Sequence, residues 1–246
     1  KEDGLTDIIL DAADHLALEN IISSGLSEFS HFDNRLTIKY INPLYEGEEK
    51  EIVINYHGGT GSGVAWEGGI VYSGNQLYSL NCPYGMSEWI PCKDHPSDKA
   101  NGMDIKVTLP ESYIVASNGV RSGITDNGDD GTRTHHWIES HPIATYLFNI
   151  SADSYNETIE YFHYSETDSM PIIYFTTGTV PSGFHYVETA LPIFSNLFGL
   201  YPFVDEKFAI NKVSSMGGAM EHQNNVTTST TNGMTQVHEL GHQWFG

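Results

Sequence analysis

The sequence has few cysteines and no long apolar run, and both shortages exclude classes of protein. Its 246 residues include two cysteines, Cys82 and Cys92, and no CxxC pair, so a cysteine zinc site is not expected. A disulfide between them and two buried free thiols both fit this spacing. A disulfide would indicate an oxidising compartment, so a secreted or periplasmic location is favoured over a cytoplasmic one. No apolar run approaches the length of a membrane span.

Positive charge is also scarce. Lysine and arginine number 11 against 32 aspartates and glutamates, which gives a formal net charge of −21. Such a surface repels nucleic acid and anionic membranes, so neither is expected as a partner. It suits a soluble protein and would attract cationic ligands such as free amino termini. Hydrophobic residues make up 39% of the chain, which is enough for a sizeable core and excludes a disordered composition.

The first two-thirds of the chain alternates apolar and polar residues in short runs. Residues 35–41 and 50–58 follow this two-residue period, and residues 45–49 between them are predicted to be the turn of a hairpin. Residues 126–131, DNGDDG, predict another hairpin turn. Many short strands at regular spacing predict a mostly β fold, with an antiparallel β-sandwich or saddle-shaped sheet over residues 1–170.

The sequence pattern changes near residue 171, where we place a domain boundary. Residues 182–198 have apolar side chains at helical spacing, which predicts a helix that is kinked at Pro192. Residues 234–245 predict a final helix. Residues 171–246 are therefore expected to form the beginning of an α/β domain.

The final predicted helix contains the sequence HELGH, residues 238–242. His238 and His242 are four residues apart and so lie on one face of a helix, where two imidazoles can bind one Zn²⁺. Glu239 would lie beside the metal, where it can take a proton from zinc-bound water and pass it to a leaving amine. The pattern predicts a zinc hydrolase, with two solvent-facing histidines on a surface helix as the alternative reading.

A second motif, GGAMEHQ, lies upstream at residues 217–223. Together with HELGHQWFG at residues 238–246, it resembles the aminopeptidase N family of zinc metallopeptidases, whose catalytic domain is thermolysin-like. The resemblance implies a zinc-dependent aminopeptidase, in which Glu221 binds the free α-amine of a peptide substrate. It also implies that a short backbone segment lies along the peptide like an added strand, formed by Gly218, Ala219 and Met220.

The resemblance extends into the β-rich part, where residues 87–119 are similar to a stretch of the family's β-domain. Two positions near the amine-binding residue depart from the family pattern. His222, counted here with the substrate-binding residues, replaces an asparagine and alters the shape and pH response of the site. Cys82 stands near a position where some members use glutamine or glutamate to help bind the amine.

Two further family residues have no counterpart in this sequence. The family's third zinc ligand is a glutamate about twenty residues beyond the second histidine, and its oxyanion-stabilising tyrosine lies further on. Since the sequence stops four residues after His242, we expect a fragment cut at both ends, with weak zinc binding and little activity alone. The alternatives are another hydrolase on the same scaffold, such as an endopeptidase or epoxide hydrolase, and a non-enzymatic β-sandwich recognition module.

Overall fold

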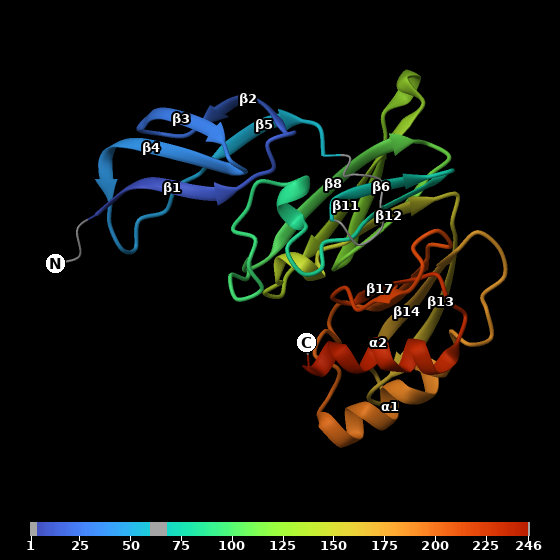
Figure 1. Ribbon diagram of the computed structural model, residues 1–246. Helices are drawn as coiled ribbons and strands as arrows, with labels where there is room; N and C mark the ends of the chain where they lie inside the picture. Colours follow the sequence, from blue (N-terminus) through green and yellow to red (C-terminus); the bar gives the residue numbers. More distant parts are fainter. Residues whose placement is uncertain (1–3, 60–67, 246) are drawn as a thin grey trace.

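A computed structural model of the chain describes residues 4–59 and 68–245. Strands make up most of the N-terminal and middle parts, and the two helices lie side by side in the C-terminal part (Figure 1). Most of the strand pairs are antiparallel. The predicted mostly β fold with antiparallel sheets is therefore confirmed.

The first five strands form two small antiparallel sheets. They are β1 (Leu5–Asp11), β2 (Ala17–Ile22), β3 (Leu26–Phe32), β4 (Arg35–Leu44) and β5 (Val53–His57). In the three-stranded sheet β4 lies between β1 and β3, while β2 pairs with β5. Leu36 and Ile38 of β4 are fully buried, and they share one core with Ile21 of β2 and Ile54 of β5.

Residues 35–41 and 50–58 do not form the predicted hairpin, so that prediction is wrong. Both edges of β4 are occupied by β1 and β3, so β5 has no access to it and pairs with β2 instead. The hairpin that does form joins β3 to β4 through Asp33 and Asn34, whose φ angles are 56° and 55°. Two consecutive residues with positive φ are the geometry of a tight two-residue β-turn, which aspartate and asparagine tolerate.

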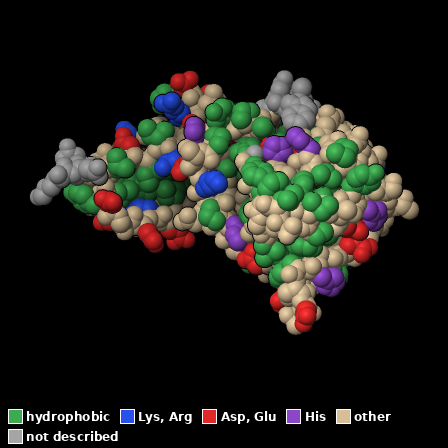
Figure 2. All heavy atoms as spheres, turned by 90° about the horizontal axis from the view of Figure 1, so that it is seen from below, with side chains coloured by type: hydrophobic (Ala, Val, Ile, Leu, Met, Phe, Trp, Pro, Cys, Tyr) green, Lys and Arg blue, Asp and Glu red, His purple; other side chains and the backbone are tan. Residues whose placement is uncertain are grey.

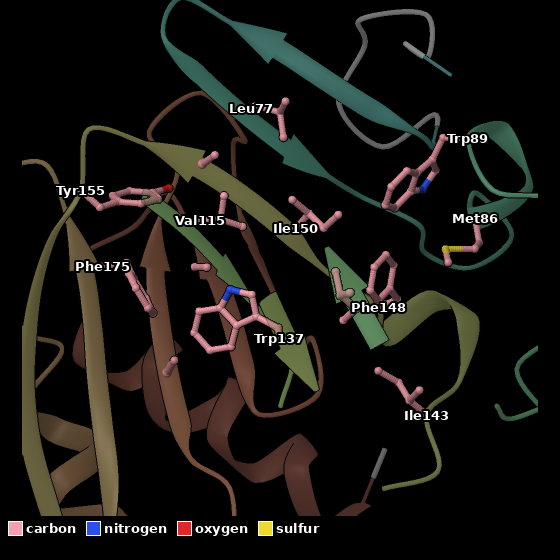
Figure 3. Packing of buried hydrophobic residues seen from close by; sticks show 14 residues of the cluster. Leu77, Met86, Trp89, Val115, Trp137, Ile143, Phe148, Ile150, Tyr155 and Phe175 are labelled. Atoms are coloured by element: carbon pink, nitrogen blue, oxygen red, sulfur yellow. The ribbon is translucent and has the colours of Figure 1, made fainter. Parts of the chain in front are cut away.

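The middle of the chain forms two more antiparallel sheets, in the orders β10-β11-β8 and β6-β7-β12-β9. Their strands are β6 (Ile70–Ser73), β7 (Gln76–Ser79), β8 (Met103–Pro110), β9 (Ile114–Ser117), β10 (Val120–Asp126), β11 (Thr132–Glu139) and β12 (Ile150–Asp153). The turn predicted at residues 126–131 is confirmed, because it joins β10 to β11. Aromatic side chains fill the core of these sheets, among them Trp89 stacked on Phe148 (Figure 3).

The C-terminal part is a five-stranded mixed sheet with two helices. Its elements are β13 (Asn156–His163), β14 (Ser169–Thr176), α1 (Tyr186–Phe198), β15 (Phe208–Lys212), β16 (Ala219–Met220), β17 (Asn225–Thr228) and α2 (Gly233–Phe245). The strand order is β13-β14-β15-β17-β16, with β14, β15 and β17 parallel to one another. Parallel strands of this kind are usually covered on both faces.

The two faces of this sheet bury their side chains in different cores. On β14, Ile172 and Tyr174 pack with α1 and α2, whereas Ile173 and Phe175 belong to the core of the middle sheets. Successive side chains of a strand point to opposite faces, so this alternation places the sheet between the helices and the middle sheets. Phe175 contacts Trp137 edge-to-face, at 6.3 Å between ring centroids (Figure 3).

The C-terminal part agrees with the sequence predictions in some elements and differs from them in others. The final helix predicted at residues 234–245 is confirmed. The helix predicted from residue 182 begins at Tyr186, after a series of turns, and Pro192 lies inside it. The five-stranded sheet already includes β13, and residue 171 falls within β14, so the domain boundary there stays a prediction. Cys82 and Cys92 are both free thiols.

The two helices of residues 4–59 and 68–245 have 13 residues each. Neither α1 nor α2 is long and apolar enough to cross a bilayer.

Phe175→Ala tests whether the sheet and the middle strands share one core. Phe175 is fully buried between them, so we expect its loss to lower the free energy of unfolding by about 3–5 kcal/mol. Phe32→Ala is the control, because that side chain is 69% exposed and should change stability by less than about 0.5 kcal/mol. Urea denaturation followed by fluorescence and circular dichroism should show one shifted transition. Two transitions, of which only one shifts, would contradict a shared core.

Candidate active site

Helix α2 presents a polar pair of histidines at the surface. It begins after Asn232, whose side-chain Oδ1 accepts hydrogen bonds from the backbone N–H groups of Met234, at 2.8 Å, and Thr235, at 3.4 Å. This is the arrangement of a helix N-cap. Leu240 lies on the opposite face and is fully buried, which fixes how the helix rotates against the sheet. His238 and His242 therefore lie outward, one turn apart.

The two imidazoles converge as the sequence predicts. The Nε2 atoms of His238 and His242 are 3.1 Å apart, and the ring centroids are separated by 4.7 Å. Two nitrogen ligands of one tetrahedral zinc ion, each at about 2.0–2.1 Å, lie roughly 3.3 Å from each other. The spacing therefore fits a pair of ligands that bind the same ion.

Two carboxylates lie beside the histidine pair. Ligand atoms of Glu221, Glu239 and His242 all lie within 4.8 Å of one another. This cluster joins the two motifs, which are 17 residues apart in the sequence, in one place. Imidazole nitrogens together with carboxylate oxygens are a donor set that suits zinc.

Glu239 is the most buried acidic group of this cluster, with 5% of its surface exposed. Burial and, to a smaller extent, the negative charge of Glu221 raise the pKa of its carboxyl group to about 7, while His242 opposes the shift. A carboxyl group whose pKa lies near neutrality can both accept and return a proton at physiological pH.

Glu221 directly follows β16, the edge strand of the five-stranded sheet. β16 pairs with β17 on one side, and no strand of the described residues pairs with its other side. Two bonds hold the segment before it: Ser229 Oγ accepts from the N–H of Gly218 at 2.8 Å, and Gly218 O accepts from the N–H of Ser229 at 2.8 Å. Ala219 is half-buried, whereas Met220 is buried against β7 residues such as Tyr78.

Two side chains from the middle of the chain face the Glu221 carboxylate. Burial raises the pKa of the Cys82 thiol, and the negative charge of Glu221 adds to the shift. Burial likewise raises the pKa of Tyr146, again with contributions from Glu221 and Cys82. Cys82 thus lies near Glu221, in the neighbourhood where the sequence resemblance places it. Tyr146, in a short 3₁₀ turn at Thr145–Leu147, carries no motif that could have revealed it.

His222 faces the interior. Its side chain is fully buried, and its Nδ1 atom lies 3.0 Å from Thr227 Oγ1 on β17. Burial lowers the pKa of His222 to about 3, so the ring is neutral at physiological pH. A fully buried ring cannot touch a substrate at the surface, so only the backbone of His222 is available for the substrate-binding role that the sequence suggests.

Two hollows flank the histidines. One, of about 310 Å³, is lined by Glu221, Gln223, His242 and Gln243 together with Phe203 and other side chains. The other, of about 510 Å³, is lined by Phe194, Met234, Val237, His238 and Phe245, among others. The lower face of the molecule carries histidine side chains beside a broad hydrophobic area (Figure 2). The site is therefore open to molecules from solution.

Comparison with known proteins was made on both sequence and fold. Residues 81–147 match the Peptidase M1 N-terminal domain. The whole fold is similar to the M1 zinc metallopeptidase from Deinococcus radiodurans, with a TM-score of 0.84 and 25% sequence identity. Residues 81–147 are thus similar in sequence to an M1 peptidase N-terminal domain, and the chain as a whole has the fold of the M1 zinc metallopeptidases. Zinc is thus the metal that the family implies, and the residues of this site fit it.

Other solved structures share this fold. A mutant of the Deinococcus radiodurans enzyme bound to a Tyr-ser-ala substrate has a TM-score of 0.84 and 24% identity. Legionella pneumophila aminopeptidase A in complex with aspartic acid has a TM-score of 0.83 and 16% identity. All three matches cover 100% of this chain, which spans 57% and 58% of the two Deinococcus chains and 30% of the Legionella chain. No curated protein sequence matches the chain.

The buried His222 ring should make the stability of the folded chain depend on pH. In the unfolded chain a histidine takes up a proton below about pH 6.5, whereas the folded His222 stays neutral down to about pH 3. The unfolded state binds more protons in this window, so stability falls as the pH falls through it. Between pH 7.5 and pH 5 this residue should remove about 2 kcal/mol.

His222→Asn is the matched variant, because asparagine can hydrogen-bond but does not titrate. Urea unfolding at several pH values should show that the difference in stability between wild type and variant changes by about 2 kcal/mol over this range. A difference that stays constant with pH would mean that His222 is protonated in the folded protein.

Proposed function

We propose that the protein to which these residues belong is a zinc-dependent aminopeptidase that releases N-terminal residues from peptides. The observation that carries the proposal is the cluster of Glu221, Glu239 and His242, whose ligand atoms lie within 4.8 Å of one another. It supports a site in which a group that can bind an amine lies next to the groups that can cleave a bond. Because the chain spans little more than half of the Deinococcus radiodurans enzyme, the proposal concerns the whole protein.

In this proposal His238 and His242 hold the zinc ion, for which their converging Nε2 atoms are suited. Zinc, when bound, supplies a Lewis acid that polarises a carbonyl group and lowers the pKa of water. Glu239 accepts a proton from the attacking water and returns it to the amine that leaves. Its raised pKa, about 7, supports both halves of this transfer at neutral pH.

Glu221 binds the free α-amine of the peptide in a charge-assisted hydrogen bond. The outer edge of β16 offers backbone groups along which an extended peptide can lie as an added strand, through Gly218, Ala219 and Met220. Since Glu221 and Glu239 are so close, only one residue fits between the bound amine and the bond that is cleaved. Two complexes are consistent with small ligands of this kind: a two-domain M1 zinc metallopeptidase mutant bound to L-arginine, and the Deinococcus radiodurans mutant bound to a Tyr-ser-ala substrate.

A peptide with a free N-terminus and its acetylated counterpart separate this proposal from its rivals. We expect the complete natural protein to cleave the first peptide only, because acetylation removes the charge that Glu221 binds. Chromatography of the products measures this directly. Cleavage of both peptides would indicate an endopeptidase, and cleavage of neither would favour a recognition module.

Two conservative variants assign the roles of the carboxylates. Glu221→Gln should lower kcat/KM for the free peptide by about 10- to 100-fold, since it removes one charge-assisted hydrogen bond. Glu239→Gln should lower kcat by about 10²- to 10⁴-fold, since it removes the proton acceptor. Steady-state kinetics at equal zinc content distinguish the two effects. A Glu239→Gln variant with unchanged kcat would exclude this residue as the general base.

A further inference from the structure

Gln243, the residue after the second histidine of α2, contacts the segment that carries Glu221. Its Oε1 atom accepts a hydrogen bond from the backbone N–H of Asn224 at 2.7 Å. Its Nε2 atom lies 3.3 Å from the carbonyl oxygen of Glu221 and 3.4 Å from that of His222. One side chain, 7% exposed, thus binds three backbone groups of residues 221–224.

Asn224, at the end of that segment, is itself fixed from the other side. It has a φ angle of 48°, a left-handed conformation that needs support from its surroundings. Its Oδ1 atom accepts hydrogen bonds from the N–H of Gly119 at 2.9 Å and from Lys207 Nζ at 2.8 Å. Its Nδ2 atom donates to Glu139 and to Glu206, each at 2.7 Å.

This network ties the segment to the middle sheets. Gly119 lies next to β10 and Glu139 ends β11, so Asn224 is bound to strands far from it in the sequence. Glu139, Glu206 and Lys207 are all at most 5% exposed. Buried charges that are hydrogen-bonded in this way are costly to separate, so the position of Asn224 is rigid.

From these contacts we propose that Gln243 is a positioning residue that sets the distance between the Glu221 segment and the zinc helix. Asn224 is held in place by the middle sheets. The Gln243 amide is hydrogen-bonded to the backbone of Asn224, and so fixes α2 relative to it one residue beyond His242. The inference rests on the proposed aminopeptidase function, in which this distance decides whether a bound amine places the first peptide bond at Glu239. In this role Gln243 acts through the backbone of the segment that carries Glu221.

Gln236 offers a matched control on the same helix. It is also fully buried, and its Nε2 atom donates to Thr230 O at 3.2 Å and to Thr228 Oγ1 at 3.3 Å. Thr228 pairs with Ala219 of β16, but neither of these bonds reaches residues 221–224. Methionine has nearly the shape of glutamine and lacks its hydrogen-bonding groups, so Gln243→Met and Gln236→Met each remove the bonds with little change in volume.

Hydrogen exchange and kinetics on the complete natural protein test the inference together. Gln243→Met should speed exchange of the backbone amides of residues 221–224 and lower kcat/KM for a free-amine peptide at least 10-fold, mainly through a higher KM. Gln236→Met should lower the melting temperature by a similar amount while both quantities stay within about 2-fold of wild type.

Three results would overturn the inference. Unchanged exchange at residues 221–224 in Gln243→Met would mean that the amide does not hold the segment. Faster exchange without a change in KM would mean that the position of the segment does not matter for the reaction. An equal rise in KM in Gln236→Met would mean that the rise in Gln243→Met comes from general destabilisation of the fold. If the wild type cleaves no peptide, the proposed function fails, and exchange alone decides whether Gln243 holds the segment.

Discussion

Asn224 joins three buried charged side chains, Glu139, Glu206 and Lys207, at the junction of the middle sheets and the C-terminal sheet. Burial raises the pKa of Glu139 to about 7, with a contribution from Glu206, while burial lowers the pKa of Lys207 against the attraction of both carboxylates. Each of these side chains, if buried there as a charge without the others, would destabilise the folded state. The middle sheets and the C-terminal sheet are therefore held in one fixed arrangement, because neither could bury these charged side chains without the other.

The rigid packing of the C-terminal sheet against the middle sheets also holds the candidate site in place. The parallel strands β14, β15 and β17 are packed on both faces, so the loops at their ends have little freedom to move. Edge strand β16 and helix α2 meet beside those loops and bring Glu221 to Glu239 and His242. A site assembled from rigid elements needs little rearrangement when a ligand binds, which favours catalysis.

Local sequence patterns were enough to predict the parts of this site that depend on one element. The helical spacing of His238 and His242 fixes their convergence, and the resemblance to a zinc peptidase family added Glu221. What could not be predicted depends on pairing between distant segments. The pairing of β4 with β1 and β3 follows from competition among strands of similar pattern, and the contact of Asn224 with Glu139 spans 85 positions of the sequence. Likewise, no local pattern distinguishes the buried His222 ring from a surface histidine.

We propose that the two motifs form one amine-binding zinc site. A crystal structure of the complete natural protein with zinc and a free amino acid, with anomalous scattering measured at the zinc edge, tests it most directly. We expect the zinc peak at the Nε2 atoms of His238 and His242, with the α-amine of the ligand at the Glu221 carboxylate. A zinc peak elsewhere, or an amino acid bound with its amine away from Glu221, would contradict the claim.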